Sequence, residues 1–215
     1  VGLPLAVGLS KKYDVIGFDI NSLRIEDLKN AKDVTNELTK TDIACLKNIK
    51  LTFDENDLVE ANQFIVTVPT PIKKNNDPDM SYLIKASELV SKHIKKGTHI
   101  IYESTVYPGA TEEVCLPILQ KNTNLEFNQD FFLGYSPERI NPGDKKHKLE
   151  NIVKVTSGSN DEAAEFIDDL YNSVIDAGTF KASSIKVAEA AKVIENTQRD
   201  LNILSLIHIS EPTRP

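Results

Sequence analysis

The chain has 215 residues, of which 40% are apolar and 27% charged, and its formal net charge is −7. These values are ordinary for a globular protein of one large domain, or of one domain and the start of a second. The acidic balance argues against a nucleic-acid-binding surface, and the lack of an apolar run of about 18 residues argues against a membrane span. Two distant cysteines and no secretory leader predict a reducing, cytoplasmic location without a disulfide framework.

The chain opens on residues 1–9, which predict a helix with Pro4 in its first turn, where a missing N–H is tolerated. Apolar runs then alternate with segments of helical period. The predicted strands are 13–19, 63–68, 98–103, 131–136 and 151–156, and the predicted helices between them are 79–96, 111–120 and 161–174. This alternation predicts an α/β fold, a doubly wound parallel sheet covered on both faces. Such a domain should not open on a helix, so we expect that its first strand is missing.

Ligands of such sheets bind beyond the carboxyl ends of the strands, and unusual residues follow those ends. Gly2 opens the first helix and Asp19 closes the next strand, as in the back half of a dinucleotide-binding unit. An acid at this point bonds the ribose hydroxyls and repels a 2′-phosphate, which favours NAD over NADP. Arg24 is near enough to reach the same ribose, although Asp19 could be a turn residue and Arg24 a solvated one.

Two further strand ends display hydroxyl groups. Pro69 and Pro71 must stop their strand, because proline cannot donate ladder hydrogen bonds, and this leaves Thr70 at the sheet edge. Thr105 is presented by the loop that follows the next strand. Thr111 is expected only to cap the helix after that loop.

The loop at 134–143 places Glu138 beside Arg139 after the fourth strand. Adjacent opposite charges are usually surface decoration, but these two follow a strand end like the other candidates.

A long helix is predicted over 184–203, with Ser183 or Ser184 as its N-cap. Its polar face carries Glu189, Lys192, Asn196 and Arg199. This face could simply be solvated, but a lysine and an asparagine one turn apart can also polarise a substrate oxygen and hold a developing oxyanion. Residues 204–215 leave the helical pattern for a short β-like run and a proline-rich stop, and we expect this tail to be of non-native origin.

Five segments, at 1–6, 68–71, 103–109, 135–143 and 188–199, resemble the UDP-glucose/GDP-mannose dehydrogenase family in order. The closest likeness is to its UDP-N-acetylhexosamine branch, and it covers 1–203 nearly end to end. The resemblance implies a Rossmann-like NAD-binding domain over 1–182 that lacks its first strand, and the start of a central dimerisation domain over 183–203. It also implies NAD as cofactor, a UDP-sugar substrate, no metal, and a homodimer for the full-length parent.

The resemblance implies that the parent oxidises a UDP-N-acetylhexosamine at its sixth carbon to the uronic acid, for bacterial capsule or O-antigen synthesis. Family members pass through a cysteine thiohemiacetal and thioester. The glycine-rich segment with that cysteine has no match here, so we expect the fragment itself to be inactive. The alternatives are a two-domain dehydrogenase of the 6-phosphogluconate or hydroxyacid type, and an NAD-binding module without turnover.

Matching motif positions implies roles for individual residues. The cofactor would be bound by Val1, Gly2, Asp19, Arg24, Pro69, Thr70 and Thr105. The catalytic residues would be Thr105, Glu138, Lys192 and Asn196. The substrate would be bound by Glu138, Arg139, Asn141, Lys192, Asn196 and Arg199.

Overall fold

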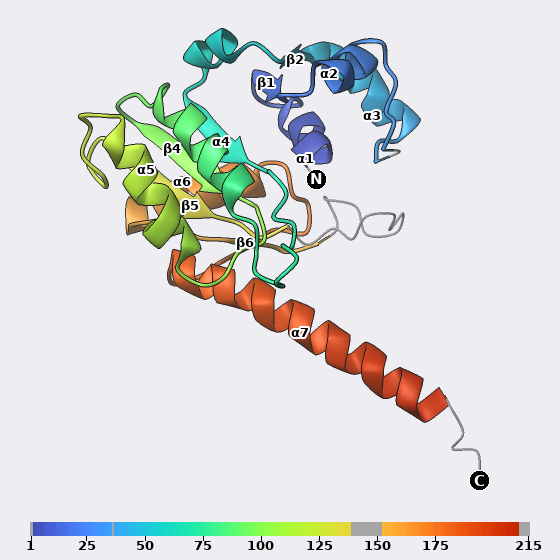
Figure 1. Cartoon of the computed structure of the whole chain (residues 1–215). Helices are drawn as coiled ribbons and strands as arrows, with labels where there is room; N and C mark the ends of the chain where they lie inside the picture. The colour runs from blue at the N-terminus through green and yellow to red at the C-terminus, as the bar shows by residue number, and fades with distance from the viewer. Residues whose placement is uncertain (1, 36, 139–151, 211–215) are drawn as a thin grey trace.

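The computed structural model describes residues 2–35, 37–138 and 152–210, with side chains described as far as residue 202 (Figure 1). The strands are β1 (Val15–Phe18), β2 (Ile49–Thr52), β3 (Gln63–Val66), β4 (Thr98–Tyr102), β5 (Phe131–Tyr135), β6 (Lys154–Thr156) and β7 (Thr179–Lys181). The helices are α1 (Gly2–Leu9), α2 (Ser22–Lys29), α3 (Lys40–Cys45), α4 (Ser81–Ser91), α5 (Leu116–Lys121), α6 (Asp161–Asn172) and α7 (Ile185–Ser210). Short 3-10 helices lie at Leu46–Asn48 and Glu55–Glu60, and a π-helical turn at Thr111–Cys115 leads into α5.

The five predicted strands and all the predicted helices are present, and every pairing between the named strands is parallel. The strands form the sheet β3-β4-β5 and the pairs β1-β2 and β6-β7. Strands β2 and β7 were not predicted, because runs of four and three residues are too short to show a period. The parallel α/β prediction is confirmed.

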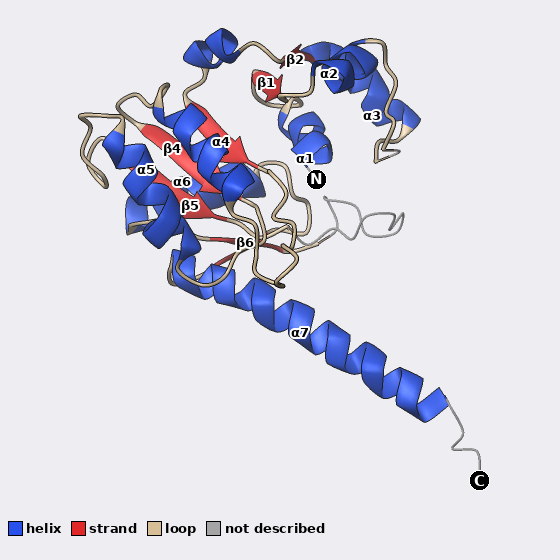
Figure 2. Ribbon diagram, in the orientation of Figure 1, coloured by secondary structure: helices blue, strands red, loops and turns tan. Residues whose placement is uncertain are grey.

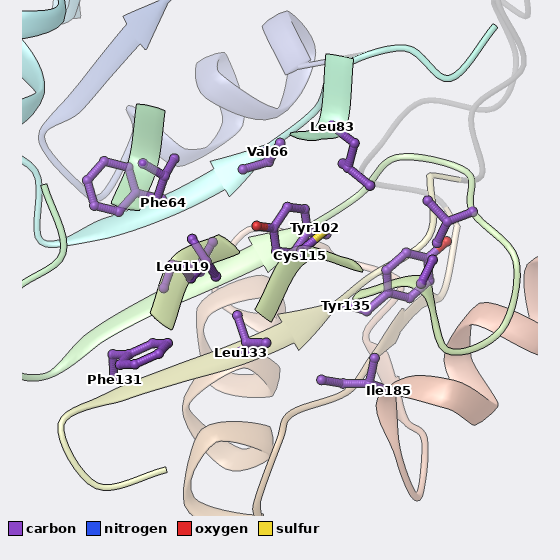
Figure 3. Close-up of a cluster of buried hydrophobic side chains, with 14 of the residues drawn as sticks. Phe64, Val66, Leu83, Tyr102, Cys115, Leu119, Phe131, Leu133, Tyr135 and Ile185 are labelled. Carbon is purple, nitrogen blue, oxygen red and sulfur yellow. The ribbon is translucent and has the colours of Figure 1, made fainter. Parts of the chain in front are cut away.

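Strand β4 lies at the centre of the three-stranded sheet and is buried along its whole length. Successive side chains of a strand point to opposite faces, and each face of this sheet is covered by helices. On one face Ile100 belongs to a cluster with Leu83 of α4 and Leu119 of α5 (Figure 3). On the other face Ile101 belongs to a cluster with Ile167 of α6. Figure 2 shows the helices and strands of the domain in blue and red. This two-sided burial explains why two apolar residues, Ile100 and Ile101, follow each other in β4.

Helix α1 contributes to two cores. Leu5 and Leu9 pack in the cluster of α6 and β4, whereas Val7 packs with Ile25 of α2 and Leu51 of β2. The helix therefore connects the β1-β2 unit to the main sheet.

Helix α7 begins where it was predicted, because the Ser184 hydroxyl accepts a hydrogen bond from the Val187 N–H at 3.2 Å. It continues to Ser210, so the predicted β-like run is wrong for residues 204–210. No proline or glycine interrupts 185–210, and the first helix breaker is Pro212. Figure 1 shows the later turns of α7 leaving the body of the domain. Within the described part of the chain, no helix combines the length and apolar character that a membrane span requires.

Candidate functional site

The loops that follow β3 and β4 are bonded to each other at the carboxyl edge of the sheet. The Thr70 hydroxyl donates to the Thr105 carbonyl at 2.6 Å, and the Ser104 hydroxyl donates to the Val68 carbonyl at 2.6 Å. The Thr105 side chain is exposed, and Pro69 is exposed beside Thr70. The structure therefore brings together three residues that the sequence assigned to the cofactor.

A buried cluster of charged side chains lies at the same edge. Lys154, the first residue of β6, places its Nζ 2.8 Å from Glu103 Oε1 and 3.7 Å from Glu138 Oε2. The Tyr171 hydroxyl of α6 donates to Glu103 Oε1 at 2.5 Å, and Lys154 Nζ lies 5.2 Å from the centre of the Tyr171 ring. The predicted catalytic residue Glu138 is thus one member of a four-residue network.

Burial dominates the electrostatics of this cluster. Burial raises the pKa of the Glu103 carboxyl, the charge of Glu138 raises it further, and the Lys154 ammonium opposes both. Burial, followed by the charge of Glu103, raises the pKa of the Tyr171 phenol well above its usual range. Tyr171 therefore stays protonated at physiological pH and can donate its hydrogen bond to Glu103.

Helix α7 is fastened to the loop after β4 by a buried carboxylate. Glu189 Oε2 accepts a hydrogen bond from the Gly109 N–H at 2.5 Å, and its Oε1 accepts one from the Thr111 N–H at 2.9 Å. Gly109 has a φ of 99°, a conformation that other residues rarely adopt. The predicted capping role of Thr111 is wrong, because the turn that it begins has no side-chain cap and the Glu189 carboxylate takes its N–H.

The three predicted site residues of α7 follow this attachment. Lys192, one turn after Glu189, is buried, and its Nζ lies 3.9 Å from Glu195 Oε2. Asn196 Oδ1 accepts a hydrogen bond from Arg199 Nη2 at 2.5 Å, and both residues are half-buried. Because Glu189 attaches this part of α7 to the loop after β4, it also fixes the position of Lys192 relative to that loop.

The predicted dinucleotide residues lie on the α1-β1-α2 part of the chain. A Cβ atom on Gly2 would come within 2.3 Å of Thr67 Oγ1, so only glycine allows α1 to approach the end of β3 this closely. The Asp19 carboxylate accepts a hydrogen bond from the Asn21 N–H at 2.8 Å and lies 3.9 Å from Arg24 Nε. The Asp19 side chain is 40% exposed, so its carboxylate accepts the hydrogen bond of the turn and is still accessible at the surface. This glycine and this acid fit a dinucleotide.

Val1, Arg139 and Asn141 lie outside the described residues. The cysteines lie away from the sheet edge. Cys115 is buried in the apolar cluster beside Tyr102, and burial raises the pKa of its thiol to about 11 (Figure 3). Cys45 ends α3 and is half-buried. Among the described residues, no group of His, Cys, Asp and Glu side chains is arranged to hold a metal ion.

Sequence reasoning did not identify Glu103, Lys154 or Tyr171, and it placed Glu189 on a polar helix face without a role of its own. A signal was available for Lys154, because it interrupts the apolar run at 152–156. A charge within a strand that is buried on both faces must be paired. Glu103 ends its strand as Asp19 does.

Residues 1–175 match the family model described as "UDP-glucose/GDP-mannose dehydrogenase family, NAD binding domain". The chain belongs to this family, and this part of it is the family's NAD-binding domain. It is 60% identical over 203 residues to UDP-N-acetyl-D-glucosamine 6-dehydrogenase of Pseudomonas aeruginosa, covering 94% of this chain and 48% of that protein. It is 58% identical to Protein CapL of Staphylococcus aureus, covering 94% of this chain and 48% of that protein.

Among solved structures, UDP-D-ManNAc dehydrogenase from Pyrococcus horikoshii is similar with a TM-score of 0.86 and 33% identity, covering 94% of this chain and 49% of that one. The chain thus spans about half the length of the curated relatives it matches. Membership of this family excludes the 6-phosphogluconate or hydroxyacid type that the sequence had left open.

Proposed function

We propose that this chain is the cofactor-binding part of a dehydrogenase that uses NAD to oxidise a UDP-N-acetylhexosamine at its sixth carbon to the uronic acid. The observation that carries the proposal is a buried glutamate, Glu138, at the same carboxyl edge of the parallel sheet as the bonded Thr70–Thr105 pair. The names of the relatives at 57–60% identity support the substrate. We place the enzyme in the cytoplasm, in the synthesis of a bacterial surface polysaccharide.

The proposed cofactor site uses residues from both parts of the sheet. The Asp19 carboxylate would accept hydrogen bonds from the adenosine ribose, with Arg24 beside it. Gly2 would admit the pyrophosphate to the start of α1, together with Val1, which lies outside the described residues. Pro69, Thr70 and Thr105 would line the nicotinamide end. When bound, NAD would supply the hydride acceptor.

The proposed chemistry divides between the sheet edge and α7. Glu138 would accept a proton during the oxidation, and Thr105 would help to order a water molecule. The Lys192 ammonium and the Asn196 amide would hold the substrate oxygen as negative charge develops on it. We assign Arg139, Asn141 and Arg199 to binding of the sugar nucleotide. Because the thiol of Cys115 is buried in the core, we propose that the chain by itself does not complete the oxidation to the uronate.

We further propose the division into an NAD-binding domain over 1–182, the start of a dimerisation helix over 183–203, and a non-native tail over 204–215. Helix α7 exposes the apolar side chains of Val187, Val193, Ile194 and Leu201. Exposed apolar groups along one helix support its pairing with a second copy in the complete enzyme.

NADH formation by the full-length parent with UDP-GlcNAc, UDP-GalNAc and UDP-glucose tests this proposal. We expect about two NADH per sugar with an acetamido sugar, since two hydrides must be removed on the way to the acid. Glu138→Gln should lower kcat, while Glu88→Gln, an exposed glutamate of α4, serves as the matched control. Comparable turnover of UDP-glucose would refute the substrate assignment, and absence of NADH with every nucleotide sugar would refute the activity.

A further inference from the structure

The buried cluster at the sheet edge contains a lysine whose position has a consequence for Glu138. The Lys154 side chain is 3% exposed, and those of Glu103 and Glu138 are 0% and 9% exposed. The lysine is closer to Glu103, at 2.8 Å, than to Glu138, at 3.7 Å. Glu103 therefore holds the lysine, and the lysine in turn faces Glu138.

Each member of the cluster comes from a different element. Glu103 follows β4, Glu138 follows β5, Lys154 begins β6 and Tyr171 lies on α6. Neighbouring hydrogen bonds fix these elements, since the Ser136 hydroxyl donates to the Val155 carbonyl at 2.7 Å. The Lys154 ammonium is consequently held between two carboxylates that belong to two separate strand ends.

The charges explain what this arrangement does. Two buried carboxylates close together cannot both ionise easily, because like charges in a poorly solvated site repel. One ammonium between them offsets that repulsion, as in other buried ion pairs. Among the described residues, Tyr135 of β5 also faces Glu103, and the pKa of its phenol is raised by burial and then by the charges of Glu189 and Glu103. Tyr135 and Tyr171 are thus neutral, and within the part of the chain that the structure describes Lys154 supplies the positive charge of the cluster.

We propose that Lys154 is a positioning residue for Glu138: held by Glu103 and Tyr171, its ammonium holds the Glu138 carboxylate in place at the edge of the sheet. The inference rests on the proposed function, in which Glu138 accepts a proton during the oxidation. It adds that Glu103 acts on the reaction only through Lys154.

The first test does not need activity. Glutamate labelled with carbon-13 at its carboxyl carbon allows Glu103 to be titrated by NMR in the chain, with Glu103→Gln identifying its signal. Because Lys154 lowers the pKa of Glu103, Lys154→Met should move its titration upward by about one pH unit or more. Lys181→Met, on the neighbouring strand β7 and paired with Glu165, is the matched control and should leave the signal in place. An unmoved Glu103 signal in Lys154→Met would overturn the proposal.

The second test uses the pH dependence of kcat/KM of the full-length parent, on whichever nucleotide sugar it oxidises. Lys154→Met should move the acid limb to higher pH by about one unit, because the ammonium that favours the ionised form of the neighbouring carboxylates is then removed. Glu103→Gln should move it to lower pH, because Lys154 then faces Glu138 alone. In the double variant the acid limb should lie at a pH between those of the two single variants. A lysine with a purely structural role does not produce this outcome.

The two tests separate the possible failures. A parent without dehydrogenase activity refutes the proposed function, and the NMR titration still decides whether Lys154 controls the cluster. An active parent whose acid limb is the same in Glu103→Gln as in the wild type refutes the positioning role. Should Lys154→Met fail to fold, Glu103→Gln carries the test, because it keeps the volume of the buried side chain.

Discussion

The attachment of α7 through Glu189 leads to a quantitative prediction. Both carboxylate oxygens of this fully buried residue accept a backbone N–H, from Gly109 at 2.5 Å and from Thr111 at 2.9 Å. A hydrogen bond to a charged group contributes about 1.5–3 kcal/mol, and a buried N–H left without an acceptor is destabilising by a similar amount. Glu189→Gln keeps one acceptor and should lower the free energy of unfolding by about 2 kcal/mol. Glu189→Ala loses both and should lower it by about 4 kcal/mol.

Urea unfolding of the chain, followed by far-ultraviolet circular dichroism, measures these differences. Asp200→Asn is the matched control, since it removes an exposed carboxylate from the same helix and should change the stability by less than about 0.5 kcal/mol. The reasoning is refuted when Glu189→Gln is no less stable than this control. In the full-length enzyme Glu189→Gln should also raise KM or lower kcat, because Lys192 follows Glu189 by one turn on α7.

Three further outcomes are expected. Asp19→Ser in the full-length parent should raise kcat/KM for NADP relative to NAD, because the carboxylate no longer repels a 2′-phosphate; equal use of both cofactors by the wild type would remove this role. Burial lowers the pKa of His99 below 6.5, so the unfolded state binds a proton that the folded state resists. Stability should therefore be complete above about pH 6.5 and decline as the pH falls below it, and urea midpoints should decline less in His99→Phe, which keeps the ring stack with Phe132. Alkylation followed by peptide mass spectrometry should modify Cys45 well before Cys115, whose pKa burial raises to about 11, and equal rates would contradict the buried placement.

The architecture could be predicted from the sequence because its signals are local. The apolar runs at 98–103 and 131–136 are strands buried on both faces, and the helical stripe at 79–96 covers one of those faces. The Ser184 cap also depends on neighbours in sequence, since Ser184 bonds Val187 three residues on. The end of α7 could not be read in the same way, because apolar β-branched residues suit a strand and a helix alike when no breaker intervenes.

The candidate site was predicted in part for the same reason. Strand ends at a parallel sheet edge converge, so Thr70, Thr105 and Glu138 could be identified by following each apolar run to its end. Their partners could not be identified, because no local pattern states which distant residue a buried charge will meet.

Five of the strands, the parallel sheet and the loops that carry polar residues could be predicted from the sequence, since hydrophobic period and turn chemistry act over a few residues. The contacts that fix the site depend on the folded chain as a whole. Tyr171 bonds Glu103 across 68 residues and Glu189 bonds Gly109 across 80. Such pairs form because a charge enclosed by packing must find a partner in space, and the partner is chosen by the fold as a whole.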